Sequence, residues 1–325
     1  MVMTQKIITE DIAYSVDPDK DPPSVRPNFE TVSALPAHDP EIEKHIFFGP
    51  VTSQFSISIK FRDMLDNANI TPVQAYQILV RDLPGDIRSG QSGMPVIDLR
   101  LQDKIHIQAH QDNQKLFGDS RKFLDAETVG SGNMVVNFGQ GNGTGRRLMR
   151  NEIELFTLMG FKKFEIQASM GNGAYSWARL GFLPKNDISR DALSLQLKHR
   201  ISMLREFNII NNVQADELRT LADLDAPEDI RNIANLRENL FTRLDPVFRQ
   251  NTATLTEDWF VGNEQGVTHI IASLNQAGQS GGYFPLARAL LTAASWAGEL
   301  DLTNRSELGH VAEYTGGFKY LDLTV

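Results

Sequence analysis

The clearest pattern of apolar and polar positions lies in the middle of the chain. Residues 132–138 are mostly bulky or β-branched and are bordered by glycine, which is typical of a β-strand. Over residues 148–159, apolar side chains recur every three or four positions, so one face is apolar and a helix is predicted. Gly160 is expected to end this helix. Residues 164–168 alternate between apolar and polar and predict a half-buried strand, and a second, short helix is expected before residue 181.

The segments on either side carry weaker patterns. Residues 45–111 indicate strands with one or two helices, among them a strand over residues 55–59 and a helix over residues 71–80 that opens with a Thr-Pro pair. Residues 96–99 and 104–110 predict an antiparallel pair of strands. In the last part of the chain the spacing is mainly helical, and we expect helices over residues 193–210, 217–224, 227–244 and 286–291.

These patterns divide the chain unevenly, and its 325 residues allow about two domains or one domain with a large extension. Residues 1–45 contain many prolines and few periodic apolar positions, which predicts an extended or disordered N-terminal arm, with a docking or secretion segment as the alternative. Residues 46–185 are expected to form an α/β domain. Residues 186–325 are expected to form a mainly helical C-terminal extension, which either completes a groove for a large substrate or serves as a homodimer surface.

The composition narrows the classes of function. The formal net charge of −9 argues against nucleic acid as the main partner, because phosphate contacts need a basic surface, and it slightly favours a cationic substrate. The absence of cysteine excludes disulfides, thiolate zinc sites and a cysteine nucleophile. No apolar run approaches the length of a membrane span and no signal-peptide core follows the first Met, so we expect a cytoplasmic location, with a secreted effector left open.

His106, Gln108 and His110 would share one face of the strand over residues 104–110. Histidine titrates near neutral pH, so this face is either a polar wall that contains a general base or an ordinary solvated sheet face. A metal site built from the two histidines alone is not expected, because four strand residues separate them by about 13 Å. We therefore predict no metal cofactor.

A glycine-rich segment opens the central helix, with the sequence Gln140-Gly-Asn-Gly143-Thr-Gly145-Arg-Arg147. Glycines let a ligand approach the backbone closely, and the free N–H groups at the positive end of a helix favour phosphate. The segment is not a Walker loop, which ends in Gly-Lys-Ser/Thr, and its glycines lack the Gly-x-Gly-x-x-Gly spacing of a dinucleotide fingerprint. The spacing that fits is Gln-x-x-Gly-x-Gly, formed by Gln140, Gly143 and Gly145.

This spacing, together with the strand before it and the strand and short helix after it, resembles the cofactor-binding half of the GNAT superfamily of N-acetyltransferases. The resemblance implies a mixed, mostly antiparallel sheet flanked by helices, and acyl-coenzyme A (acyl-CoA) as co-substrate. It also implies that backbone N–H groups bind the pyrophosphate, assisted by the charge of Arg146 or Arg147, and that the strand over residues 134–138 binds the pantetheine arm. The cofactor-binding residues implied in this way are Val136, Asn137, Phe138, Gln140, Gly141, Asn142, Gly143, Thr144, Gly145 and Arg146.

The activity implied by the resemblance is that of an acyl-CoA-dependent N-acyltransferase, which transfers an acetyl or longer acyl group to an amine of a small molecule, peptide or protein. In the family, a tyrosine four residues before a Gly-Phe pair often protonates the leaving thiolate. Here that position holds Trp177, whose indole is no acid at neutral pH.

Two other residues are candidates for the missing acid. Tyr175 is one, and the alternative for it is an aromatic side chain packed on the sheet. Ser169, where the strand over residues 164–168 ends, is the other, and the alternative for it is ordinary turn chemistry. The alternative function is a non-catalytic GNAT-like module of an effector, toxin or assembly that binds CoA or a partner, and Trp177 favours that alternative.

Overall fold

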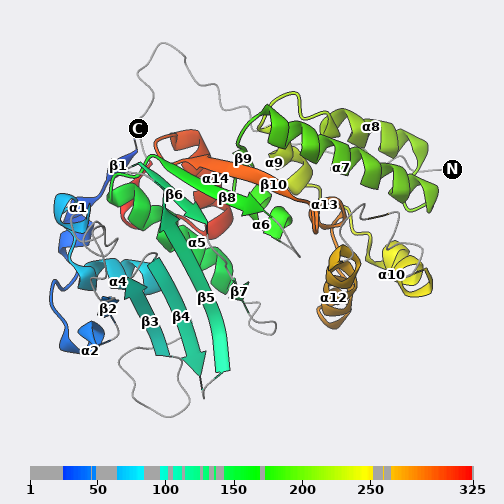
Figure 1. Cartoon of the computed structure of the whole chain (residues 1–325). Helices are drawn as coiled ribbons and strands as arrows, with labels where there is room; N and C mark the ends of the chain where they lie inside the picture. The colour runs from blue at the N-terminus through cyan, green and yellow to red at the C-terminus, as the bar shows by residue number, and fades with distance from the viewer. Residues whose placement is uncertain are drawn as a thin grey trace.

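A computed structural model describes residues 25–44, 46–48, 64–83, 96–101, 105–111, 114–124, 127–131, 135–136, 143–168, 173–251, 259 and 265–323. A mixed β-sheet with helices packed against it forms one part of the molecule, and a group of helices lies beyond one end of the sheet (Figure 1). In the described residues the strand order is β2-β3-β4-β5-β6-β8-β10-β9, with β7 beside β5. These strands are β2 (Ile46–Phe48), β3 (Val96–Leu101), β4 (Ile105–Gln111), β5 (Gln114–Phe123), β6 (Thr128–Ser131), β7 (Val135–Val136), β8 (Lys163–Ala168), β9 (Leu183–Pro184) and β10 (Trp296–Asp301).

The pairing of the described strands is mostly antiparallel. β2 and β3 are parallel, as are β6 and β8, and the remaining neighbours are antiparallel. The predicted α/β class with a mixed sheet is therefore confirmed. The antiparallel strand pair predicted over residues 96–99 and 104–110 is also confirmed, as β3 and β4, with Val96 opposite His110. The strand predicted over residues 55–59 lies outside the described residues.

Helix α4 (Pro72–Val80) begins as its sequence predicts. Thr71 is the N-cap: its hydroxyl accepts from the Gln74 backbone N–H at 3.2 Å, and the Gln74 side chain accepts from the Thr71 N–H at 2.9 Å. This capping box satisfies two N–H groups that a helix start leaves without partners, and Pro72 fits the first turn because it has no N–H to satisfy. The apolar face of α4 is buried, with Tyr76 fully enclosed.

The central elements also follow the prediction. Helix α5 (Thr144–Leu158) covers the expected range, and Gly160 follows it with a φ of +84°, a conformation that glycine adopts without strain. Strand β8 and the short helix α6 (Gly173–Arg179) come next, again as expected. Phe156 on α5 packs edge-on against Phe164 on β8, with ring centroids 5.6 Å apart.

Buried polar side chains of α5 fix its position against distant segments. Asn151 donates from Nδ2 to the carbonyls of Leu79 and Arg81, at 3.0 and 2.7 Å, and so completes the end of α4. Glu154 forms an ion pair with Arg81, with Oε2 at 2.8 Å from Nη1, and its other oxygen accepts from the backbone N–H groups of Lys319 and Tyr320. Burial raises the pKa of Glu154, while Arg81 and the backbone donors act in the opposite direction.

The C-terminal part is mainly helical, but it also completes the sheet. Its helices are α7 (Asp187–Glu206), α8 (Asn212–Ala222), α9 (Asp229–Ala234), α10 (Phe241–Gln250), α12 (Gln265–Gln279), α13 (Leu286–Leu291) and α14 (Arg305–Thr315). Strand β10 lies between β8 and β9. The predicted boundary after residue 185 therefore runs between two hydrogen-bonded strands, although the division into domains stays a prediction.

Pairing between distant segments explains one difference from the expected helices. The segment predicted as one helix over residues 227–244 is divided into α9 and α10, because the backbone between them pairs with residues 284–286: the Leu240 N–H donates to the Phe284 carbonyl at 2.8 Å.

In β10, Gly298 is packed so tightly that a Cβ there would lie 2.5 Å from the Trp296 ring and 2.9 Å from Ile166. Only glycine fits at this position of β10, opposite Ile166 of the neighbouring strand β8.

Helix α7 closes the outer edge of β10 beyond β9. The Ser189 hydroxyl donates to the Ala297 carbonyl at 2.8 Å and accepts from the Ala297 N–H at 2.9 Å, so that one side chain replaces a strand partner. The Gln196 side chain does the same for the backbone of Ser295, at 3.0 Å in both directions. An uncovered strand edge invites pairing with another chain, and these contacts protect it.

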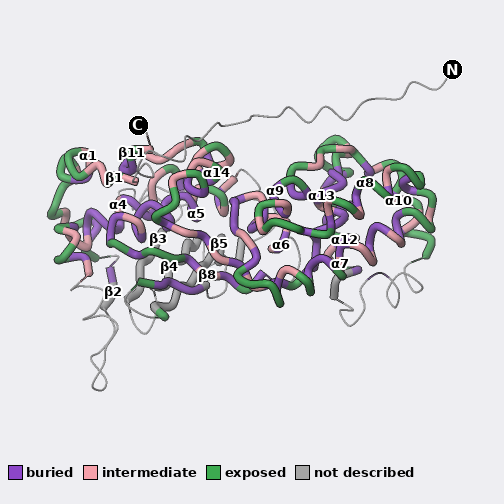
Figure 2. The backbone as a smooth tube through the Cα atoms, turned by 90° about the horizontal axis from the view of Figure 1, so that it is seen from above, coloured by how far each residue is buried: buried purple, intermediate pink, exposed green. Residues whose placement is uncertain are grey.

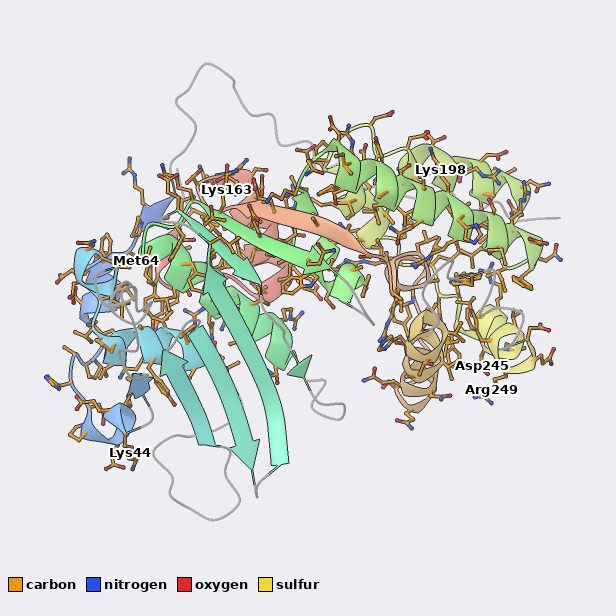
Figure 3. The ribbon with its side chains drawn as sticks, viewed as in Figure 1. Lys44, Met64, Lys163, Lys198, Asp245 and Arg249 are labelled. Carbon is orange, nitrogen blue, oxygen red and sulfur yellow. The ribbon has the colours of Figure 1, made fainter. Side chains whose placement is uncertain are left out.

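The helical group is held mainly by apolar packing. One cluster of buried apolar residues extends through the sheet and the helical group, and Figure 2 shows buried residues in both. Other ion pairs are more exposed than that of Glu154 with Arg81: Lys163 on β8 contacts Glu299 on β10 at 2.9 Å, and Arg249 contacts Asp245 within α10 at 2.9 Å (Figure 3). No helix among the described residues is both long enough and apolar enough to cross a membrane.

The N-terminal segment differs in part from the predicted arm. Residues 25–44 form strand β1 (Arg26–Pro27) and helices α1 (Phe29–Ser33) and α2 (Pro40–Glu43), with Val32 buried. This segment is ordered by a contact with a distant part of the chain: β1 pairs with β11 (Leu321–Asp322). Residues 1–24 lie outside the described part.

Candidate functional site

The start of α5 lies where strands of the sheet end. β6 and β8 are parallel neighbours, and α5 is part of the connection between them. In such a unit the helix begins at the carboxyl end of the strands, which is where ligands bind in open α/β sheets. Because α6 follows the carboxyl end of β8, the beginnings of α5 and α6 lie at the same end of the sheet (Figure 1).

The positive end of the α5 dipole is not neutralised by residues of its own first turn. Gly143 is the N-cap in the left-handed conformation, with φ 78° and ψ 15°, and no side chain of a described residue caps the helix. The first turn contains no acidic residue, but it does contain Arg146 and Arg147. A helix start carries unpaired N–H groups and about half a positive charge, and a further cation there is unfavourable. The electrostatic potential at this turn therefore favours a bound anion.

Two side chains of this turn add to that picture. Arg146 folds back over the cap, because a Cβ on Gly143 would lie 3.2 Å from its Nη2. The Thr144 side chain is 2% exposed, and its hydroxyl oxygen is buried without a hydrogen-bond partner. Buried hydroxyls almost always have partners, so an unpartnered one beside a helix start is unusual. Arg146 and Thr144, two of the predicted cofactor-binding residues, therefore lie next to the backbone N–H groups at the start of α5.

Helix α14 brings an aromatic side chain to the same place. Arg146 donates from Nη1 to the Tyr314 carbonyl at 3.3 Å, and its guanidinium carbon lies 5.4 Å from the centre of the Tyr314 ring. Arg179, at the end of α6, lies 4.8 Å from the centre of the same ring. Burial raises the pKa of the Tyr314 hydroxyl, while the charges of Arg179 and Arg146 act in the opposite direction.

Tyr175, one of the two predicted acids, lies within this group. Its hydroxyl accepts a hydrogen bond from Arg179 Nη1 at 3.1 Å, and the Arg179 guanidinium is 5.9 Å from its ring centre. On the other side is Arg288 of α13, which donates to the Ser273 hydroxyl at 3.2 Å. Burial lowers the pKa of Arg288, and its interaction with Tyr175 opposes that shift. As an acceptor from Arg179, the Tyr175 hydroxyl keeps its own proton for donation.

Trp177 lies on the other face of α6 and belongs to the core. It is 7% exposed, and its ring meets that of Phe182 at 5.2 Å and an angle of 71°. The two aromatic residues of α6 thus have different surroundings, as the helical spacing predicts. The residue four positions before the Gly-Phe pair is therefore a core side chain in this structure.

The remaining predicted residues divide into two groups. Gly145 lies in the first turn of α5, and Val136 lies on β7 opposite Phe117 of β5. The others lie outside the described residues; they are Asn137, Phe138, Gln140, Gly141, Asn142 and Ser169. Sequence reasoning missed Arg179, Tyr314 and Arg288. Arg179 is only two residues from Trp177, whereas no local pattern identifies Tyr314 or Arg288.

Cationic and aromatic side chains gather near the start of α5. Arg146 and Arg179 both contact the Tyr314 ring, and Arg179 also donates to the Tyr175 hydroxyl. Within the part of the chain that the structure describes, no group of three or more His, Asp or Glu side chains is placed to hold a metal. The chain matches no protein-family model, and comparisons with curated proteins and with solved structures give no similar protein.

Proposed function

We propose that the protein is an acyl-CoA-dependent N-acyltransferase of the GNAT type, which acts on an amine of a small molecule, peptide or protein. The observation that carries this proposal is the start of α5. A left-handed glycine cap, the absence of a capping side chain and of any acid, and an arginine folded over the cap together favour a bound phosphate group. The pyrophosphate of acyl-CoA is such a group.

The order of elements around this turn supports the same proposal. Strand, glycine loop, helix, parallel strand and short helix follow one another, as in the cofactor half of the GNAT family. In that family, two neighbouring strands separate and the acyl thioester lies between them. Within the described residues, β6 pairs with β8 over Thr128–Gly130, whereas β7, which follows β6 in the chain, pairs only with β5. This pairing is compatible with such a separation.

The proposed reaction is direct transfer. The backbone N–H groups of residues 141–146 would hold the pyrophosphate, and the strand over residues 134–138 would bind the pantetheine arm. The unprotonated amine attacks the thioester carbonyl and a C–N bond forms. The nitrogen then loses a proton to water, the C–S bond breaks, and the departing thiolate takes up a proton. Tyr175 is the described residue best suited to give that proton, because Arg179 orients its hydroxyl as an acceptor and leaves the O–H free to donate.

The second candidate function is a non-catalytic GNAT-like module that binds CoA or a partner. The burial of Trp177 against Phe182 favours it, because this side chain takes the usual place of the acid and packs in the core. The two candidates differ in turnover. The chain contains no cysteine, so thiol reagents report released CoA without background from the protein. Tight CoA binding without thiol release from any amine would favour the binding module.

The cofactor site is tested by a pair of glycine substitutions at the two ends of α5. Gly143→Glu places a carboxylate at the proposed pyrophosphate site, while Gly160→Glu introduces the same side chain at the other end, where a Cβ meets nothing within 4 Å. Both glycines have positive φ, so both variants carry similar backbone strain. Isothermal titration with CoA should show a loss of about 10- to 100-fold or more for Gly143→Glu only, since each lost charged hydrogen bond costs ~1.5–3 kcal/mol. Equal affinities of the two folded variants would refute the proposed site.

A further inference from the structure

Two arginine side chains share one tyrosine ring beside the start of α5. The guanidinium carbons of Arg146 and Arg179 lie 5.4 and 4.8 Å from the centre of the Tyr314 ring, within the range of cation–π contacts. Since both lie near one centroid, the two guanidinium carbons are at most about 10 Å apart. They come from α5 and α6, and Tyr314 comes from α14, so three helices must be in place to form this Arg146–Tyr314–Arg179 cluster.

No carboxylate of a described residue balances these two charges. Among the described residues, neither Arg146 nor Arg179 forms an ion pair, although Arg81, Arg150 and Arg243 each do so. The protein has 41 acidic and 32 basic residues, so acidic side chains are in excess. Two neighbouring cations without a carboxylate in such a chain repel each other and the positive end of α5. The arrangement favours an anionic group that lies outside the protein chain.

Toward the described residues, the two guanidinium groups of the cluster use few of their hydrogen-bond donors. A guanidinium has five N–H donors. Arg146 gives one hydrogen bond to the Tyr314 carbonyl, and Arg179 gives one to the neutral Tyr175 hydroxyl. The buried Arg200 provides a contrast, because it donates to the carbonyls of Leu290 and Thr292 at 2.6 and 2.7 Å and so joins two segments. Planar guanidinium groups with free donors are the preferred partners of phosphate oxygens.

We propose that Arg146 and Arg179, held by Tyr314, form a second oxyanion subsite for a phosphate group, next to the backbone N–H groups of α5. This inference rests on the proposed function, which places the first anionic group of the ligand, the pyrophosphate, at the start of α5. The phosphate has two sources to consider: the 3′-phosphate of CoA itself, or a phosphate on the acceptor substrate. In either case the site binds two separate anionic groups, and helix α14 takes part in ligand recognition.

The experiment compares CoA with 3′-dephospho-CoA by isothermal titration on the full chain. The test variant is Arg179→Met, which keeps the aliphatic stem, and the control is Arg205→Met, which removes the same charge from an exposed position on α7. If the group is the 3′-phosphate, the wild type should bind CoA about 10-fold or more tightly than dephospho-CoA, as one charged hydrogen bond is worth ~1.5–3 kcal/mol. Arg179→Met should abolish that preference, and Arg205→Met should retain it.

If the group belongs to the acceptor, wild type should bind both nucleotides equally, and inorganic phosphate should still bind to the CoA-saturated protein. That binding should be lost in Arg179→Met. The inference is overturned if both nucleotides bind equally and phosphate does not bind the saturated protein, or if Arg179→Met behaves like Arg205→Met. Failure of the proposed function gives a different result: CoA does not bind at all, while inorganic phosphate alone binds with a dependence on Arg179. That outcome would keep the oxyanion subsite and reject the cofactor.

Discussion

Glu307→Gln should change how the stability of the protein depends on pH. Glu307 lies in the first turn of α14 and is 9% exposed. One of its oxygens accepts from the Asp301 N–H at 2.9 Å, and the other accepts from the Asn304 side chain at 3.4 Å. Burial raises the pKa of Glu307 to about 7, although the Asp301 N–H and Arg231 act to lower it. The native protein therefore holds a proton on this carboxyl that the unfolded chain releases at lower pH.

The sign and size of the effect follow from this difference. The pKa of an ordinary Glu is 4.5 and that of native Glu307 is about 7, so wild-type stability should fall as the pH rises between these values. At 1.36 kcal/mol per pKa unit, the loss is about 3 kcal/mol. Glutamine keeps the shape of the protonated carboxyl and does not titrate. Glu307→Gln should match wild type near pH 4.5 and exceed its stability by about 2–3 kcal/mol near pH 7.5.

Urea unfolding at pH 4.5, 6 and 7.5 measures this effect, with Glu313→Gln as the control. Glu313 lies on the same helix and is exposed, so its substitution should shift the urea midpoint little at any pH. The decisive quantity is the difference between variant and wild type as a function of pH. A difference for Glu307→Gln that stays constant with pH, or a variant that is less stable than wild type at pH 7.5, would refute the reasoning.

Two further substitutions test the proposed acid and the closed sheet edge. Tyr175→Phe should lower the rate of thiol release by about 10²–10⁴-fold while leaving CoA affinity nearly unchanged, because a general acid acts in the transition state; an unchanged rate would exclude Tyr175 as the acid. Ser189→Ala removes the partner of the Ala297 N–H, while the Ala297 carbonyl still accepts from the Lys185 N–H at 2.9 Å, and should cost about 1–3 kcal/mol in urea unfolding. Ser202→Ala on the same helix, where the hydroxyl bonds a helix carbonyl and Arg219, is the control; equal losses in the two variants would contradict this role of Ser189.

Elements with strong local signals were predicted well. The Thr71 cap, the apolar face of α5, the alternation in β8 and the β3–β4 pair all depend on neighbours within a few positions. Strand β10 was missed, although Trp296, Gly298, Leu300 and Leu302 alternate with polar or small residues. Its surroundings in the sequence are helical, and a six-residue alternation is a weak signal on its own. What makes it a strand is the edge of β8, more than a hundred positions earlier in the chain.

The sequence alone determined helix α5 and predicted the glycine loop before it, because the helix depends on a period of three to four residues and the loop on backbone freedom. It also separated Tyr175 from Trp177, since two helical steps place them on different faces. Only the tertiary structure decided which charges meet at this loop. Arg146, Arg179 and Tyr314 are far apart in sequence, and they come together because the sheet places the starts of α5 and α6 at one end while α14 packs beside α5. Contacts between distant segments leave no periodic trace, so the Arg146–Tyr314–Arg179 cluster has no signature in the sequence.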